Sequence, residues 1–163
     1  DSLQPFFETA KEHNKGIFIL VKTSNPASGE FQDLICGEKK LYEIIAEKTH
    51  AWGKDFVGKK GYSAIGAVVG ATFPHEISAL RKIMPMAYFL VPGYGAHGAA
   101  AKDIEYCFNS DGLGAIINAS RSILYAYNVS PWKEKYGICA WKEATQKAVI
   151  TMNEEIRKIS KSY

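Results

Sequence analysis

Residues 87–98 read AYFLVPGYGAHG, an apolar run that ends abruptly in a proline and three glycines. The run 87–91 carries no charge and no turn former, which is typical of a β-strand buried on both faces. The glycines that follow allow backbone N–H groups to approach a ligand closely. We therefore expect a buried strand whose carboxyl end carries a ligand-binding loop.

Three other apolar runs end in the same way, at a short turn of small or hydrogen-bonding residues. The runs are 17–21, 64–69 and 114–117. The turns that follow them are 23–26, 70–72 and 118–121. Because parallel strands end at one edge of a sheet, four such turns indicate a single edge at which a polar ligand is held.

Helical patterns alternate with these runs. Apolar residues recur at helical spacing over 3–13, over 40–52, in a helix that begins at Pro74, and in a shorter one over 100–108. Ser130-Pro131 is expected to open a long terminal helix, with these side chains inward: Trp141, Ala144, Ala148, Met152, Ile156 and Ile159. No hairpin signal separates the strands. The order predicts an α/β protein with a parallel sheet, as one domain over 1–163.

Two architectures fit this order: an open doubly wound sheet, or part of a (β/α)8 barrel. Both bind ligands at the carboxyl ends of their strands, where the four turns lie. The choice between them stays open at this level.

Bulk composition excludes several classes of function. The net charge of +3 comes from 20 basic and 17 acidic residues without a continuous basic stripe, so we expect no nucleic-acid partner. No apolar run approaches the roughly 20 residues of a membrane span. Three widely spaced cysteines indicate reduced thiols in a cytoplasmic protein. No histidine pair has the spacing of a metal site, and we expect no metal.

The glycine loop has two other interpretations. Residues 93–98 match G-x-G-x-x-G after a strand, which is typical of dinucleotide binding, and Arg121 after the next strand suits the 2′-phosphate of an NADP-type cofactor. A glycine loop without a ligand is the plainer alternative. His97 is the one histidine inside this loop.

The other strand ends are equally open to a plain interpretation. Arg121 is either a surface cation or a phosphate clamp, for which the planar guanidinium is suited. Ser24 is either part of a simple turn before Pro26 or a hydrogen-bonding group for a planar ligand.

Taken together, the four strand ends resemble those of orotidine 5′-phosphate decarboxylase, in particular its bacterial branch with longer chains. The matching segments are FILVKTSNP (18–26), VVGAT (68–72), LVPGYGA (90–96) and GLGAIINASR (112–121). The resemblance covers most of the chain, in order and in spacing. It implies a (β/α)8 TIM barrel, of which this chain supplies the last four βα units, and a homodimer. It also implies conversion of orotidine monophosphate to uridine monophosphate and CO2 without metal or organic cofactor.

The resemblance assigns the substrate-binding residues. Ser24 contacts the pyrimidine edge, and Pro92 and Gly93 line the base. His97 lies in the loop that closes toward the phosphate, at a position that is typically Gln in the family. Ser120 and Arg121 bind the phosphate with a backbone N–H and a guanidinium.

The family's catalytic Asp and Lys network has no counterpart in this sequence. Part of that network is a D-x-K-x-x-D motif, and none of the five aspartates here has Lys two positions later. We therefore expect no catalytic residue in this chain, which is inactive alone and takes the N-terminal half of the barrel as its partner. The alternatives are an NADP-type cofactor domain built on residues 93–98 and a non-enzymatic half-barrel interaction module.

Overall fold

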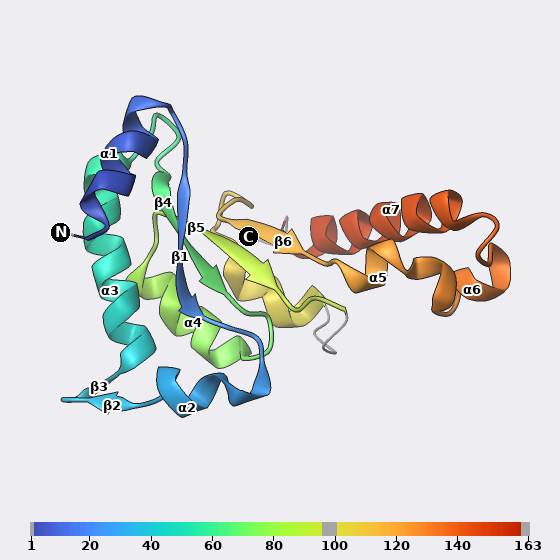
Figure 1. Ribbon diagram of the computed structural model, residues 1–163, viewed down its shortest axis with the longest axis horizontal. Coiled ribbons are helices and arrows are strands. Elements are labelled where there is room, and N and C mark those ends of the chain that lie inside the picture. Colours follow the sequence, from blue (N-terminus) through green and yellow to red (C-terminus); the bar gives the residue numbers. More distant parts are fainter. Residues whose placement is uncertain (1, 96–100, 161–163) are drawn as a thin grey trace.

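The computed structural model describes residues 2–95 and 101–160. Its main sheet has four parallel strands in the order β1-β4-β5-β6 (Figure 1). Their bounds are β1 (Ile17–Lys22), β4 (Ser63–Val69), β5 (Ala87–Pro92) and β6 (Ala115–Asn118). The parallel sheet predicted from the apolar runs is confirmed.

Of the four longer helices, the first three follow the predicted bounds closely and the last begins later than predicted. The four are α1 (Gln4–Glu12), α3 (Leu41–Gly53), α4 (Pro74–Ile83) and α7 (Trp141–Ser160). The shorter ones are η1 (Pro26–Ser28), α2 (Gly29–Gln32), η2 (Lys54–Phe56), η3 (Ala101–Cys107), α5 (Arg121–Leu124), η4 (Ala126–Asn128) and α6 (Trp132–Lys135). The predicted helix over 100–108 is thus a 3-10 helix in its described part. The three cysteines are free.

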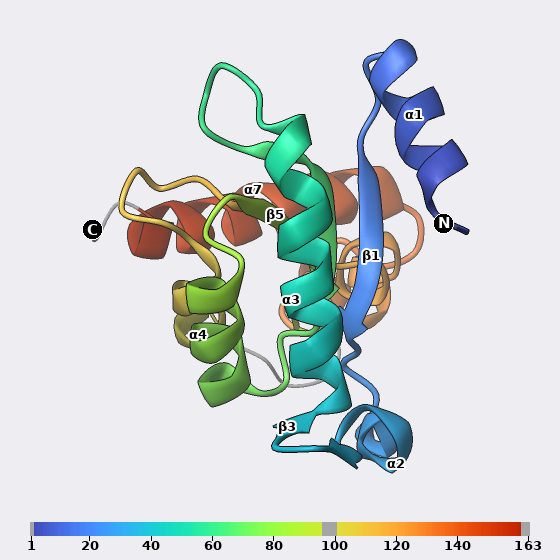
Figure 2. The same ribbon diagram turned by 90° about the vertical axis from the view of Figure 1, so that its left-hand side faces the viewer.

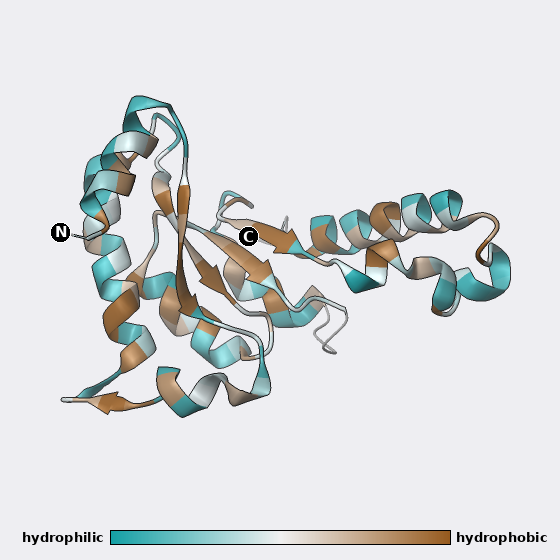
Figure 3. Ribbon diagram, viewed as in Figure 1, coloured by the Kyte–Doolittle hydropathy of each residue, from teal (hydrophilic) through white to brown (hydrophobic). Residues whose placement is uncertain are grey.

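One face of the sheet is packed against helices. The core joins Val69, Phe89 and Val91 of the strands to side chains of α3, α4 and η3, and Ile156 and other residues of α7 pack against it. Figure 2 shows α3 and α4 lying over this face, and Figure 3 shows how hydrophobic the strands are. The sheet is therefore held together by burial on the helical side.

The opposite face of the sheet is open, so the prediction that the strands are buried on both faces is wrong for this chain. Phe18, Leu20 and Ile116 are 38%, 57% and 48% exposed. The residues between them, such as Ile19, are less exposed. Exposure thus alternates along β5, β6 and the first four residues of β1, because helices of the described chain cover only one side of the sheet.

Two further predictions are corrected. The terminal helix begins at Trp141, because Gly137, with φ +59°, turns the chain just after α6. Trp141 is 48% exposed, whereas Ala144 and Ala148 are buried. A small antiparallel hairpin, β2 (Ile35–Cys36) and β3 (Lys39–Lys40), turns at Gly37, with φ +71°.

The segment from α5 to the start of α7 extends past β6, away from β1 (Figure 1). In the described part of the chain, every helix is too short or too polar to cross a bilayer. Within the same ranges, no three histidine, cysteine or carboxylate side chains gather as metal ligands.

Candidate functional site

The carboxyl ends of β1, β5 and β6 meet around one pocket of about 170 Å³. Its lining includes five of the six residues predicted to bind substrate: Ser24, Pro92, Gly93, Ser120 and Arg121. The sixth, His97, lies outside the described residues. Tyr94, Asn118 and Ala119 complete the lining. Residues from three separate strand ends are thus brought to one place.

Close backbone packing fixes Ser24 at this edge. The amide of Gly70 donates to the Lys22 carbonyl at 2.8 Å, and Thr72 Oγ1 donates to the Ser24 carbonyl at 3.0 Å. A Cβ at Gly70 would lie 2.6 Å from the Ser24 nitrogen, far inside van der Waals contact. Only glycine at position 70 therefore allows the end of β4 to pass this close to the backbone of Ser24.

The glycine loop approaches Ser24 from the other side. Gly93 has φ +98°, and a Cβ there would lie 3.0 Å from Cβ of Ser24. The carbonyl of Pro92 accepts a hydrogen bond from Ala71 at 2.9 Å. Ser24 is thus held between the ends of β4 and β5, with its side chain beside the pocket.

Tyr94 anchors the described start of the glycine loop, residues 93–95, to α7. Its ring is buried, and its hydroxyl donates to Oε2 of Glu155 on α7 at 2.6 Å. Burial, and then the hydrogen bond with the Glu155 carboxylate, raise the pKa of Tyr94 above its usual value. The hydroxyl therefore stays protonated and continues to donate at neutral pH.

Arg121 provides the charge of the site. Of the described residues that line the pocket, Arg121 alone is charged. It follows Ser120 at the start of α5, whose first turn is closed by the Leu124 amide donating to the Ser120 carbonyl at 2.8 Å. Hydroxyl, amide and guanidinium donors around a small pocket suit an oxyanion such as a phosphate. The described lining contains no carboxylate, lysine or histidine.

A parallel sheet covered by helices, with its pocket at the carboxyl ends of its strands, defines the class of α/β proteins that bind ligands at that edge. Residues 1–135 match the model of the orotidine 5′-phosphate decarboxylase / HUMPS family. The chain belongs to this family.

Curated relatives and solved structures agree with this assignment. An orotidine 5′-phosphate decarboxylase of Caldicellulosiruptor bescii is 50% identical over 127 residues, covering 78% of this chain and 42% of the relative. One of Rhodopirellula baltica is 41% identical, covering 96% and 52%. The structure of Leishmania donovani OMP decarboxylase superposes with a TM-score of 0.73 at 30% identity, covering 100% of this chain and 54% of that one.

The chain spans about half the length of the curated relatives it matches. The structural neighbours are TIM barrels, and the four parallel strands correspond to about half of such a barrel. Of the two architectures that fit the sequence, the barrel is therefore confirmed.

Proposed function

We propose that this chain is the base- and phosphate-binding half of an orotidine 5′-phosphate decarboxylase of pyrimidine biosynthesis. The observation that carries the proposal is the convergence of five predicted residues on one pocket, whose described lining carries one positive charge: Ser24, Pro92, Gly93, Ser120 and Arg121. Orotidine monophosphate places its phosphate at Arg121 and the Ser120 amide, and its pyrimidine edge at Ser24. His97, which lies outside the described residues, is expected to close over the phosphate.

The catalytic groups come from the N-terminal half of the barrel. In the reaction the bond between the pyrimidine ring and its carboxylate breaks, CO2 leaves, and a lysine of that half protonates the ring carbanion. Binding energy at the distant phosphate holds the substrate against this network and lowers the barrier there.

The open sheet face supports a half-barrel that needs a partner. Phe18, Leu20 and Ile116 form an exposed apolar surface on the side that the helices leave uncovered. Strands β1 and β6 also leave their outer edges unpaired within the described sheet. The N-terminal half covers both, and the completed barrel pairs as a homodimer.

Complementation tests the proposal. This chain is assayed for release of CO2 from orotidine monophosphate alone and after mixing with the N-terminal half of the Caldicellulosiruptor bescii relative. We expect turnover only in the mixture. Binding of NADPH in place of uridine monophosphate, or an intact complex without turnover, contradicts the proposal.

Arg121 is tested in the same mixture. We expect Arg121→Ala to lower kcat/KM by well over threefold, whereas Arg157→Ala, an exposed arginine at the end of α7, leaves it unchanged. A loss for Arg121→Ala within about threefold, or roughly 0.65 kcal/mol, contradicts the phosphate assignment.

A further inference from the structure

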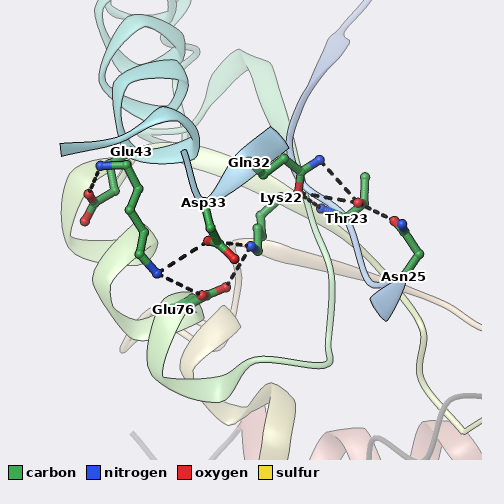
Figure 4. A network of polar contacts seen from close by, with 8 residues as sticks. Lys22, Thr23, Asn25, Gln32, Asp33, Glu43 and Glu76 are labelled. Carbon is green, nitrogen blue, oxygen red and sulfur yellow. Dashed lines mark hydrogen bonds and ion pairs between the residues drawn. The ribbon is translucent and has the colours of Figure 1, made fainter. Parts of the chain in front are cut away.

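Lys22, the last residue of β1, is a buried lysine in an otherwise apolar strand. It is 1% exposed, and its ammonium lies 2.9 Å from Oδ1 of Asp33 and 3.6 Å from Oε2 of Glu76 (Figure 4). The rings of Tyr42 and Phe73 lie 4.9 and 5.2 Å from the same nitrogen. The register of β1 against β4 shifts between Leu20 and Lys22. Val21 and Lys22 are consequently both buried, although neighbours in a regular strand point to opposite faces.

The charges around Lys22 balance. Lys40 lies 3.4 Å from Asp33 and 3.9 Å from Glu76, so two cations face two carboxylates. Burying an ammonium is costly, and an ion pair in such a place is often no more stabilising than an apolar side chain. A contribution to overall stability therefore does not explain why a lysine lies here.

The Lys22–Asp33 pair closes a loop. Immediately beside it, the Thr23 amide donates to Oε1 of Gln32 at 3.0 Å, and Nε2 of Gln32 donates to Oγ1 of Thr23 at 3.2 Å (Figure 4). These two adjacent connections join both ends of residues 24–31. The loop thus leaves the sheet at Ser24 and returns at a fixed place.

Glu76 connects the same ammonium to α4, the helix that follows β4. The two ends of the loop are therefore connected to α4. The same helix follows Gly70 and Thr72, the two residues that contact the backbone of Ser24. Lys22 itself does not line the pocket.

We propose that Lys22, with Asp33 and Glu76, is a positioning residue that fixes the loop after β1 and so holds Ser24 against the base of the bound nucleotide. The proposal rests on the proposed function for the ligand. It adds a specific consequence: loss of the Lys22 charge weakens recognition of the base and leaves recognition of the phosphate intact.

The first test needs no ligand. Hydrogen exchange of backbone amides over residues 23–32 is compared in Lys22→Met, Asp33→Asn and the control Lys39→Met, whose lysine pairs with Glu47 on the exposed surface. We expect faster exchange in this loop for the first two variants only. Asp33→Asn keeps the lysine and its Glu76 partner, so it remains informative if Lys22→Met does not fold. Exchange no faster than in the control overturns the proposal.

The second test separates base from phosphate in the complemented enzyme. We expect Lys22→Met to weaken uridine monophosphate binding about three- to tenfold, which is the contribution of one hydrogen bond between Ser24 and the base. Binding of ribose 5-phosphate should be unchanged. Lys22→Met combined with Ser24→Ala should bind no more weakly than Ser24→Ala alone. Equal losses for both ligands, or additive losses in the double variant, overturn the proposal. Failure of the unmodified complex to bind uridine monophosphate counts against the proposed function instead, while the exchange test still decides whether Lys22 fixes the loop.

Discussion

Tyr94 and Glu155 join the glycine loop to the last long helix. The Tyr94 hydroxyl donates to the Glu155 carboxylate at 2.6 Å, across 61 positions of sequence. On either side of Tyr94, Gly93 and Gly95 have φ of +98° and +74°. Two glycines in the left-handed region therefore flank one buried, hydrogen-bonded ring, which makes Tyr94 the anchor of the described start of this loop beside Arg121.

Removing this hydrogen bond should loosen the phosphate end of the pocket. A hydrogen bond to a charged group contributes about 1.5–3 kcal/mol when buried, and the exposure of Glu155 lowers this to about 1 kcal/mol. We expect Tyr94→Phe to weaken ribose 5-phosphate binding by the complemented enzyme, measured by calorimetry. Tyr106→Phe, an exposed tyrosine, and Glu154→Gln, the neighbour of Glu155, are matched controls. Unchanged phosphate binding in both Tyr94→Phe and Glu155→Gln would show that the anchor is dispensable.

Arg81 connects the amino ends of β5 and β6 through hydrogen bonds. Its guanidinium is buried and donates to the carbonyls of Met84, Ala87, Cys107 and Gly114 at 3.0, 2.7, 2.7 and 2.7 Å. It also stacks on Phe89, at 3.6 Å from the ring centroid. Burial lowers the pKa of Arg81 to about 10, so it remains charged at neutral pH.

Arg81→Met should be destabilising, because it removes the guanidinium donor from four carbonyls, although the Met84 and Gly114 carbonyls still accept from the amides of Ala87 and Phe89. A buried acceptor left unsatisfied costs about 1–3 kcal/mol, so from the Ala87 and Cys107 carbonyls we expect a loss of about 2 kcal/mol or more in the free energy of unfolding. Urea unfolding followed by circular dichroism measures it. Lys82→Met, at the exposed neighbouring position, should change the midpoint little. Similar midpoints for the two variants contradict this role of Arg81.

The sheet and much of the pocket could be predicted because they depend on local sequence. Apolar runs such as 87–91 form strands wherever helices cover them, and small residues at strand ends mark the ligand edge. Tyr94 could not be assigned in this way, because its role depends on Glu155 far along the chain. Lys22 likewise continues an apolar run, and its burial follows from the register shift and from Asp33 and Glu76.

The incorrect predictions have equally specific causes. The open face of the sheet could not be predicted from the sequence. An apolar run shows only that the side chains of a strand are apolar, whereas their burial depends on which other elements cover the sheet. The start of the last helix differs from the prediction because Ser130-Pro131 is a strong start signal, yet it opens only the short α6 before Gly137 turns the chain. The positive φ at Gly137 is a property of the folded backbone.

Gly70→Ala should displace Ser24. A methyl group at position 70 would lie 2.6 Å from the Ser24 nitrogen and 2.7 Å from its Cα, so the Ser24 backbone would have to shift. We expect a loss of about 1–3 kcal/mol in stability from this overpacking, together with weaker uridine monophosphate binding. Gly58→Ala is the control, because its methyl group meets the Tyr62 carbonyl at an ordinary 3.6 Å. Equal melting temperatures and equal binding for the two variants contradict the close packing.

The Lys22 cluster should give the chain a two-sided dependence of stability on pH. The hydrogen bond from Lys22 holds the pKa of Asp33 below its usual 3.8, so the stability that Asp33 contributes is complete above pH 3.8 and is lost as the pH falls through its folded pKa. Burial raises the pKa of Glu76 above its usual 4.5. Folding therefore favours neutral Glu76, and its contribution is complete below pH 4.5 and is lost as the pH rises through its folded pKa.

Urea midpoints between pH 3 and pH 7 separate the two groups. Asp33→Asn should flatten the fall in stability on the acid side of pH 3.8, because the amide has no proton to gain. Glu76→Gln should flatten the fall that begins above pH 4.5. Glu30→Gln, at an exposed position of α2, should leave both the decrease in stability below pH 3.8 and the decrease above pH 4.5 unchanged. If Glu76→Gln instead steepens the loss of stability above pH 4.5, Lys22 and Lys40 stabilise the Glu76 carboxylate more than burial disfavours it, and folding favours its charged form.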